Sequence, residues 1–424
     1  MPANSRSVCI IGAGAGGLTT ARTILNDGWA ERVVLLERRS NVGGVWDYGQ
    51  VVGVKKSAMY HSLHTNLPKE VMQFRDFPFS PDLPSFIPRA AVQRYLEDFV
   101  DSNRLRGFIK FNAEAVSVER SALTGRGHWR VTWREYECQR PDAARAPSFV
   151  SEDFSGVCIC NGHFDVPHIP VEFTALPNVV HSRAYDGPEP FKGHRVCIVG
   201  TGPSSADIAY EVGMVALSIT VLDRHHEGED VVFDRGTLVK RLDRTELLSF
   251  DTVLLCTGYE YSFPFLEGVG TDVVKDLLEL IMWSSDPTLA FIGLCSGVIP
   301  FPLMELQAKI YTEFMSGRLP RESLKKFELI KENNIFDMKT VCPDSGLPSR
   351  VVYWRRLVDL LDGNDHQMNL RHWRLCTEIH NDVAQRRRDK LPWEPPTYRK
   401  VQYRVEARGE ELVWSAIEPE SVPI

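Results

Sequence analysis

Two glycine-rich segments are the residues in this sequence best suited to chemistry, because each can cradle the pyrophosphate of a dinucleotide. The first is Gly12-Ala13-Gly14-Ala15-Gly16-Gly17, and the second is Gly200-Thr201-Gly202-Pro203-Ser204-Ser205. Each follows a short apolar run that is typical of a buried strand, residues 8–11 and 196–199. One such segment binds one dinucleotide. Two in one chain predict two dinucleotides held face to face, the arrangement that moves a hydride from a nicotinamide to a flavin.

The first segment has the G-x-G-x-x-G spacing of a dinucleotide loop and is followed by an acidic residue at the end of the next strand. Gly12 allows the tight turn, Gly14 lets backbone N–H groups approach a pyrophosphate, and Gly17 lets the helix pack close to the strand. The helix N-terminus then favours negative charge. Glu37 ends the next apolar run, where a carboxylate accepts hydrogen bonds from a ribose diol. We therefore expect this unit to bind one dinucleotide.

The second segment carries Ser205 in place of the third glycine, which is still a small residue. We expect this loop and the next helical residues, Ala206 and Asp207, to bind the second dinucleotide. Asp223 and Arg224 end the following strand and give conflicting signals. An arginine here can bind the 2′-phosphate of NADPH, whereas an aspartate favours the 2′-hydroxyl of NADH. The sequence leaves this choice open, with Arg224 as the candidate phosphate ligand.

Bulk properties exclude several classes of protein. A chain of 424 residues suggests two or three domains, and its net charge of −7 offers no general attraction to nucleic acid. No run approaches the ~20 apolar residues that span a bilayer, and no secretory leader precedes Val8, so we expect a cytoplasmic enzyme. None of the nine cysteines forms a C-x-x-C pair, and we expect no metal site and no disulfide.

The periodicity places both glycine-rich segments in strand–helix–strand units. Residues 7–11, 18–27 and 32–36 form the first unit, and residues 196–222 hold the second. A Pro-rich stretch at 164–170 suits a crossing between domains. The further expected elements are strands within 108–133 and 149–160, strands at 252–256 and 291–293, and helices at 91–100, 205–212 and 304–315. We expect the tail after Pro320 to be helical and polar.

A series of shorter motifs stands in a fixed order between the two units and after them. They are Gly43-Gly44-Val45-Trp46, residues 59–70 (MYHSLHTNLPKE), Phe77-Pro78-Phe79, Asn161-Gly162-His163-Phe164, residues 181–185 (HSRAY) and Cys256-Thr257-Gly258-Tyr259. This series resembles the class B flavin-containing monooxygenases, especially the soluble amine and sulfide oxygenases. The resemblance runs from Val8 to about Arg318.

The resemblance implies an α/β fold of two dinucleotide-binding, Rossmann-like domains, with the NADPH domain inserted into the FAD domain. The FAD domain would comprise residues 1–166 and 286–424, and the NADPH domain residues 167–285. It also implies a reaction in which NADPH reduces the flavin and O2 adds to it. The resulting C4a-hydroperoxyflavin then oxygenates a soft N or S atom of a small amine, thioether or thiol. No catalytic acid–base pair is needed, because the substrate supplies the lone pair.

The resemblance also assigns roles to individual residues. Asn66, between Thr65 and Leu67, lies over the flavin in the family and helps to hold the hydroperoxide. Physically this suits an amide, which donates and accepts at once without supplying an acid. The further cofactor contacts implied are Thr65, Leu67, Gly44, Val45, Trp46 and, in second rank, Gln307.

The family signature F-x-G-x-x-x-H-x-x-x-Y/F is imperfect here. His181 and Tyr185 fit it, but Ala175 and Pro177 replace the Phe and Gly. By resemblance, Tyr185 favours oxygenation of a heteroatom over Baeyer–Villiger chemistry. The altered half leaves the timing of domain motion open.

Three alternatives stay open at this point. Two are enzymes, a Baeyer–Villiger-type ketone monooxygenase and an NAD(P)H oxidase that releases H2O2. The third is a redox-sensing protein that binds both nucleotides without turnover. The sequence leaves the substrate, the choice of N or S and the oligomeric state undecided, with a homodimer as one candidate.

Overall fold

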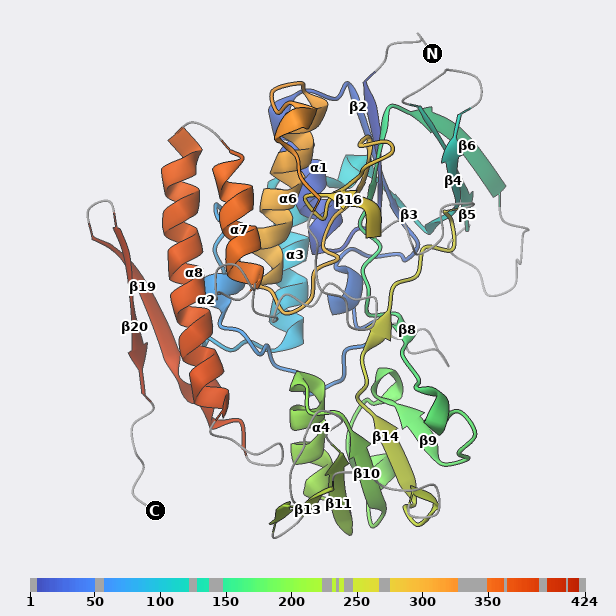
Figure 1. Cartoon of the computed structure of the whole chain (residues 1–424), viewed down its shortest axis with the longest axis vertical. Helices are drawn as coiled ribbons and strands as arrows, with labels where there is room; N and C mark the ends of the chain where they lie inside the picture. Colours follow the sequence, from blue (N-terminus) through green and yellow to red (C-terminus); the bar gives the residue numbers. More distant parts are fainter. Residues whose placement is uncertain are drawn as a thin grey trace.

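The computed structural model of the chain describes residues 6–49, 57–121, 128–136, 148–222, 231–233, 236–239, 247–266, 275–326, 349–361, 364–388, 395–408 and 411–418. Two sheets of mostly parallel strands form its frame (Figure 1). The first lies in the upper half of the view together with the long helices, and the second forms the smaller lower part. The mixed α/β architecture with two Rossmann-like units confirms the predicted fold class.

The first sheet is built around β1 (Ser7–Ile11), in which every residue is buried. It pairs in parallel with β2 (Arg32–Glu37) on one side and with β7 (Gly156–Ile159) on the other. The strand order is β16-β17-β18-β7-β1-β2-β3. The outer strands are β3 (Ile109–Phe111), β18 (Leu289–Phe291), β17 (Met282–Trp283) and β16 (Leu277–Leu278). A strand buried on both faces must be apolar at every position, which explains the continuous apolar runs in the sequence.

Helices cover one face of this sheet and a second, antiparallel sheet covers the other (Figure 1). The helices are α1 (Ala15–Asp27), α3 (Arg89–Ser102) and α6 (Pro300–Met315). α1 ends at Gly28, whose φ of 72° provides the left-handed C-cap that glycine favours. The antiparallel sheet consists of β4 (Ala113–Arg120), β5 (Trp129–Glu135) and β6 (Ser148–Phe154).

The second frame sheet repeats the arrangement around β10 (Arg195–Val199). β10 pairs in parallel with β11 (Ser218–Leu222) and β14 (Thr252–Leu255). The order is β12-β13-β11-β10-β14-β9, and α4 (Pro203–Gly213) follows β10 directly. The outer strands are β9 (Val179–His181), β13 (Gly236–Val239) and the antiparallel β12 (Val231–Phe233).

Two crossing segments join the units. β8 (Val166–Pro167), on the way out, pairs with β15 (Tyr259–Glu260), on the way back. Beside them Asp165 forms ion pairs with Arg38 at 2.8 Å and with Arg183 at 3.0 Å. The chain therefore leaves the first unit and returns to it at one place. The division at 166/167 and 285/286 stays a prediction, and β16 and β17 already belong to the first sheet before residue 286.

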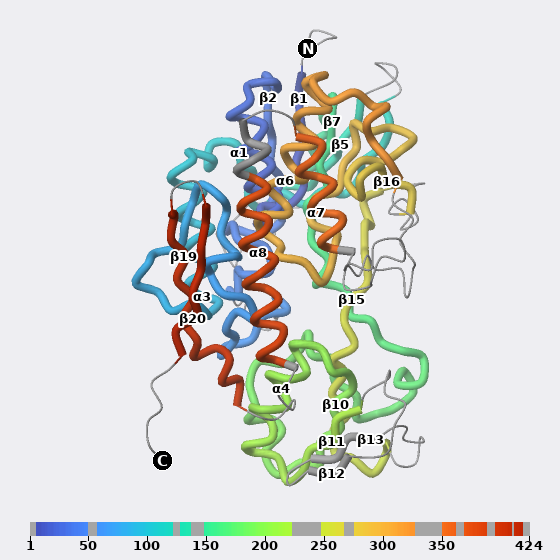
Figure 2. The backbone as a smooth tube through the Cα atoms, turned by 60° about the vertical axis from the view of Figure 1, so that its left-hand side comes forward, coloured from blue at the N-terminus to red at the C-terminus, as the bar shows by residue number. Residues whose placement is uncertain are grey.

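The C-terminal part corrects one expectation. The tail after Pro320 includes the expected helices α7 (Ser349–Asp359) and α8 (Asn364–Arg388), but it continues into a hairpin of β19 (Gln402–Arg408) and β20 (Glu411–Ile417). The hairpin lies along α8 (Figures 1 and 2). Its inward side chains alternate, with Tyr403 buried and Val405 packed on the core, which is the two-residue period of a half-buried strand.

The remaining short elements are α2 (Lys69–Met72), β8 and β15 already named, and the 3-10 turns η1 (Gly44–Trp46), η2 (Arg106–Phe108), η3 (Val171–Phe173), η4 (Ser182–Ala184), η5 (Glu189–Phe191), η7 (Arg321–Ser323) and η8 (Thr397–Lys400). Within the described residues, no helix combines the length and the apolar character needed to cross a bilayer.

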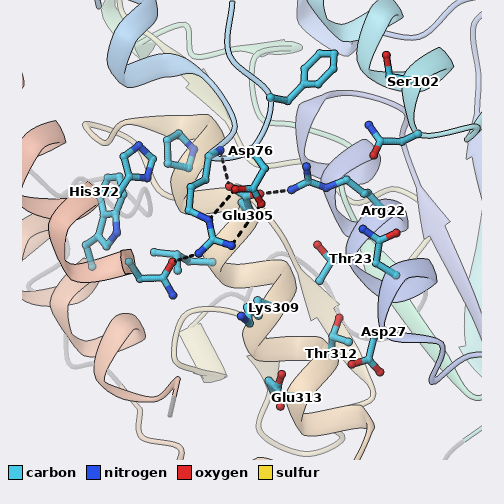
Figure 3. Close-up of a pocket in the computed structure, with 18 residues that line it drawn as sticks. Arg22, Thr23, Asp27, Asp76, Ser102, Glu305, Lys309, Thr312, Glu313 and His372 are labelled. Atoms are coloured by element: carbon cyan, nitrogen blue, oxygen red, sulfur yellow. Dashed lines mark hydrogen bonds and ion pairs between the residues drawn. The ribbon is translucent and has the colours of Figure 1, made fainter. Parts of the chain in front are cut away.

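A cavity of about 570 Å³ opens between α1, α6 and α8 (Figure 3). Glu305 of α6 lies at its centre, paired with the guanidinium of Arg22 and accepting the backbone N–H of Arg75 at 3.0 Å. The side chains of Arg22 and Glu305 are only 11% and 15% exposed. None of the predicted cofactor residues lines this cavity. It is therefore separate from the glycine-rich loops, and its ion pair serves to fix α1 against α6.

Candidate functional site

The first glycine-rich loop turns so tightly that side chains are excluded at two positions. Gly12 has φ +106°, and its N–H donates to the carbonyl of Leu36 at 2.8 Å. A Cβ on Gly12 would lie 2.5 Å from the carbonyl oxygen of Cys160, at the end of β7. A Cβ on Gly17 would lie 1.8 Å from the carbonyl oxygen of Gly12. The loop therefore requires glycine at both positions, as the spacing predicts.

The N-terminus of α1 is arranged to receive an anion. The helix begins at Ala15 with Gly14 as its N-cap, no side chain caps it, and its first turn holds no acidic residue. The first N–H groups of a helix need external partners, and the helix dipole favours negative charge there. Opposite lies Gly44, whose Cβ would come 2.9 Å from the Cα of Gly14. Among the described residues, the atoms within 4 Å of a Cβ built on Gly14 or Gly44 belong to backbone, which fits the pyrophosphate of a dinucleotide.

Glu37 lies where the sequence predicts a ribose ligand, at the end of β2. Its Oε2 accepts the N–H of Ala13 at 2.8 Å, and its Oε1 accepts the N–H of Arg39 at 2.9 Å. Burial raises the pKa of Glu37 above its ordinary value, and the two N–H donors oppose that rise. Each carboxylate oxygen has a second lone pair for a hydroxyl donor, so the group fits a ribose diol.

The turn η1 closes the first loop from the opposite side. The N–H of Gly43 donates to the carbonyl of Ala13 at 2.9 Å, and the Arg39 guanidinium donates to the carbonyl of Gly44 at 2.7 Å. Trp46 is half-buried and packs against the core. The structure thus brings Gly44, Val45 and Trp46 against the first loop, although contact with a flavin ring stays a prediction.

The second loop repeats the geometry of the first. Gly200 has φ +113°, donates to the carbonyl of Leu222 at 2.8 Å, and would place a Cβ 2.6 Å from the carbonyl oxygen of Cys256. α4 begins at Pro203 without a side-chain cap and without an acidic residue in its first turn. No atom of the described residues lies within 4 Å of a Cβ built on Gly202. This helix end is therefore also open to a phosphate.

Ser205 occupies the third glycine position of the second loop, and Asp223 and Arg224 follow the next strand. Ser205 is fully buried, and its hydroxyl has no hydrogen-bond partner among the described residues. A contact between Ser205 and a nucleotide stays a prediction. Asp223 and Arg224, on which the choice between NADH and NADPH depends, lie outside the described residues.

A segment from Ser57 to Asn66 spans the distance between the two loops. At one end, the hydroxyl of Ser57 donates to the carbonyl of Val45, next to the first loop. Further along, the hydroxyl of Tyr60 donates to Asp207 of α4 at 2.9 Å, and its ring meets that of Tyr185 edge-on at 5.3 Å. The same segment thus contacts the turn beside the first loop and the helix that begins at the second.

Asn66 stands at the end of this segment with its amide available. The preceding residue, Thr65, is buried and pairs with Ile87 in both directions, through N–H to carbonyl at 2.9 Å and through Ile87 N–H to the threonine hydroxyl at 3.1 Å. Leu67, which follows, is also buried. Asn66 itself is half-buried, and its amide has no hydrogen-bond partner among the described residues. The backbone is held on both sides while the side chain keeps its donor and acceptor for a ligand.

Gln307 is fully buried in α6, where both ends of its amide are engaged. Its Oε1 accepts the N–H of Gly293 at 2.9 Å, and its Nε2 donates to the hydroxyl of Tyr353 at 2.9 Å. These contacts fix the turn after β18. A contact between Gln307 and a cofactor stays a prediction.

His181 and Tyr185, which match the imperfect signature, both make internal contacts. His181 donates from Nε2 to the carbonyl of Gly258 at 3.0 Å and accepts the N–H of Arg183 at Nδ1, so its ring is neutral. Burial lowers its pKa further. Tyr185 donates to Glu211 of α4 at 2.5 Å. Both residues therefore support the crossing and α4.

A family model and a plant protein both match this chain over most of the residues described above. The family model described as flavin-binding monooxygenase-like matches residues 5–236, more than half of the chain. The flavin-containing monooxygenase FMO GS-OX-like 4 of Arabidopsis thaliana is 32% identical over 385 residues, which cover 80% of this chain and 81% of that protein. The chain belongs to the flavin-containing monooxygenases. The resemblance seen in the motifs is thereby confirmed.

Solved structures agree with this family assignment. The S-allyl-L-cysteine S-oxygenase of Allium sativum has a TM-score of 0.71 and 26% identity, with 94% of this chain and 95% of that chain covered. Tmm from Pelagibacter sp. strain HTCC7211, with a TM-score of 0.66 and 21% identity, shares the fold over 95% of this chain and 94% of its own. The chain is therefore an enzyme, a flavin-dependent monooxygenase.

The sequence interpretation missed one buried residue of the site, Arg399. Its guanidinium contacts both the segment that carries Asn66 and Asp207 of α4. No motif surrounds it, because a single arginine in a polar tail is ordinarily exposed. The one available signal is its place between Tyr398 and Val401, two apolar residues that are both buried.

His163 follows β7 beside the first loop, and the burial of its ring makes the stability of the fold depend on pH. Both ring nitrogens are buried, and the rings of Phe164 and Tyr261 lie 4.2 and 5.8 Å away. Burial lowers the pKa of His163 to about 4. The folded protein therefore keeps this histidine neutral at pH values where the unfolded chain takes up a proton.

We expect His163 to lower the free energy of unfolding in mild acid. Because the unfolded chain binds the extra proton below about pH 6.5, stability falls as the pH drops from 6.5 toward 4, by about 2 kcal/mol between pH 7.5 and 5. Urea unfolding of the His163→Phe variant at these two pH values should show a loss smaller by that amount. An identical pH dependence in variant and wild type would contradict the neutral, buried assignment.

Proposed function

We propose that the first loop holds FAD, that the second holds NADPH, and that the enzyme uses O2 to oxygenate a soft sulfur or nitrogen atom of a small molecule. The observation that carries the proposal is the segment Ser57–Asn66. It contacts the turn beside the first loop and the helix of the second, and it ends on a half-buried amide with no partner among the described residues. FAD, when bound, supplies the redox chemistry and the activation of O2.

Small thioethers are the substrate class we propose first. The Allium sativum protein, which covers 94% of this chain, is named for S-oxygenation of S-allyl-L-cysteine. Tertiary amines and thiols follow as secondary candidates, because their lone pairs react by the same displacement at oxygen. Cytoplasmic location and a homodimer stay predictions from the sequence.

The residues of this chain need only bind, orient and shield. Asn66 would donate from Nδ2 and accept at Oδ1 beside the flavin, and its neutral amide releases no proton. The backbone of Gly14 and Gly44 and the carboxylate of Glu37 would hold the FAD pyrophosphate and ribose. The open N-terminus of α4 would hold the pyrophosphate of NADPH and thereby place the nicotinamide.

The direct test is product analysis with the purified holoenzyme. We expect a yellow, FAD-containing protein that consumes NADPH and O2 and converts methyl phenyl sulfide to its sulfoxide. Cyclohexanone serves as the control substrate, because lactone formation would identify a ketone monooxygenase. H2O2 as the only product would identify an oxidase, and either result would replace the proposal.

We expect Asn66→Ala to uncouple the enzyme without stopping NADPH consumption. Loss of the amide removes a donor and an acceptor but leaves both nucleotide loops intact. The ratio of H2O2 to sulfoxide should therefore rise about tenfold or more. The Asn66→Asp variant keeps the shape and the acceptor Oδ1 but replaces the NH2 donor by a second acceptor, and it should be uncoupled as well. Sulfoxide yield per NADPH is the measurement. A wild-type yield in both variants would remove Asn66 from the site.

The two loops offer a matched pair of substitutions. Gly12→Ala and Gly200→Ala bring a Cβ against equivalent carbonyl oxygens, at 2.5 and 2.6 Å, in equally left-handed backbone. We expect the first variant to lose FAD and the second to keep FAD while its KM for NADPH rises about tenfold or more. Gly107→Ala, where no described atom crowds the added methyl, is the control. The reverse pattern would exchange the assignment of the loops.

A further inference from the structure

We propose that Arg399 and Asp207 act as a positioning pair, which fixes the backbone before Asn66 against α4 and so against the second loop. The inference rests on the proposed role of Asn66. It concerns two residues that are 192 positions apart in the chain and belong to the C-terminal part and to the second unit.

Arg399 makes three hydrogen bonds to groups outside its own segment. Its Nε donates to the carbonyl of Thr65 at 3.0 Å, and its Nη2 donates to the carbonyl of His64 at 3.2 Å and to Oδ2 of Asp207 at 2.8 Å. The side chains of Arg399 and Asp207 are only 13% and 15% exposed. A rigid guanidinium fork engaged in this way fixes the relative position of its acceptors.

Asp207 completes the connection on the side of α4. Its Oδ2 also accepts the hydroxyl of Tyr60 at 2.9 Å, so one carboxylate oxygen holds two donors from outside its own helix. Burial alone lowers the pKa of Arg399, but the carboxylate of Asp207 more than offsets this and leaves the pKa above its ordinary value. Arg399 is therefore charged in the folded protein. Removing either charge would leave the other buried without a partner.

The backbone that carries Arg399 is itself fixed on both sides. Tyr398 is buried and meets Phe86 edge-on at 5.3 Å, and the N–H of Tyr403 donates to the hydroxyl of Ser85 at 2.7 Å. Residues 85–86 lead directly into Ile87, the pairing partner of Thr65. These contacts hold the backbone of Arg399, whose side chain reaches Asp207 of α4 together with that of Tyr60.

This arrangement makes Arg399 irreplaceable by lysine. A lysine keeps the positive charge but is a flexible point donor, and it cannot span two carbonyls and a carboxylate in one fixed geometry. Arg399→Lys therefore separates charge from positioning. Asp207→Asn removes the charge from the other side while keeping the size of the side chain.

The experiment compares holoenzyme variants Arg399→Lys, Asp207→Asn and the double variant with wild type. We expect the ratio of H2O2 to sulfoxide to rise about fivefold in each single variant, and no further in the double variant, because both changes break the same connection. Hydrogen–deuterium exchange of the peptide 57–66 is the second readout, and we expect it to become about tenfold faster.

The control is Arg22→Gln. It breaks an Arg–carboxylate pair of similar burial on the cavity of Figure 3, whose lining includes none of residues 57–67. It should lower the melting temperature while leaving both the product ratio and the exchange of peptide 57–66 at the wild-type value. If Arg22→Gln changed both the product ratio and the exchange of peptide 57–66, general destabilisation would explain the effect of Arg399. That result would overturn the proposal.

The outcomes separate this inference from the proposed function. Faster exchange with an unchanged ratio, or a changed ratio with unchanged exchange, overturns the positioning role, as do additive effects in the double variant. If wild type forms no oxygenated product, the proposed function fails, and hydrogen exchange alone then decides whether Arg399 and Asp207 hold the segment.

Discussion

The site depends on one steric constraint that the chain meets twice. Where the central strand of each unit ends, the backbone passes so close to a neighbouring carbonyl that a Cβ has no room, at 2.5 Å from Cys160 and 2.6 Å from Cys256. Glycine with positive φ lets the chain turn there directly into a helix. The free N–H groups of that helix then lie at the carboxyl edge of a parallel sheet, where anionic ligands bind. Glu37 and Gly44 both contact the first of these turns, Glu37 at Ala13 and Gly44 at Gly14.

Charge placement on α4 follows from the same arrangement. Its first turn carries no acid, whereas Asp207 and Glu211 stand one turn apart further along the helix. Two carboxylates at this spacing repel each other on an isolated helix. Here each receives donors, from Tyr60 and Arg399 at Asp207 and from Tyr185 at Glu211. Arg399 thus balances the charge of Asp207, and a hydroxyl donor stabilises that of Glu211. Neither carboxylate lies in the first turn, so the helix N-terminus stays attractive to a phosphate.

The features of the site that could be predicted from the sequence are those formed by residues close together along the chain. Glycine spacing, apolar runs and the acid after β2 are neighbours along the chain, so the loops and Glu37 could be located directly. Asn66 was reached only through the family resemblance, since an asparagine near a proline is otherwise an ordinary turn residue. Arg399 could not be found, because its partners are distant in sequence and a lone arginine gives no pattern. The hairpin 402–417 has a signal in the alternation of Tyr403 and Val405, but the polar residues between them are equally compatible with a polar helix. For Gln307, the sequence predicted only a position on a helix, because its burial and the partners of its amide depend on tertiary packing.

The two loops differ in one respect that bears on how they would be used. At the third glycine position, the first loop has no space for a Cβ, 1.8 Å from the Gly12 carbonyl, while the second accommodates the whole side chain of Ser205. The turn η1 closes over Gly14, whereas no described atom crowds Gly202. A loop enclosed by its own protein suits a cofactor that stays bound through many turnovers. An open loop suits a nucleotide that enters and leaves. The packing difference therefore agrees with the proposed assignment of FAD to the first loop and NADPH to the second.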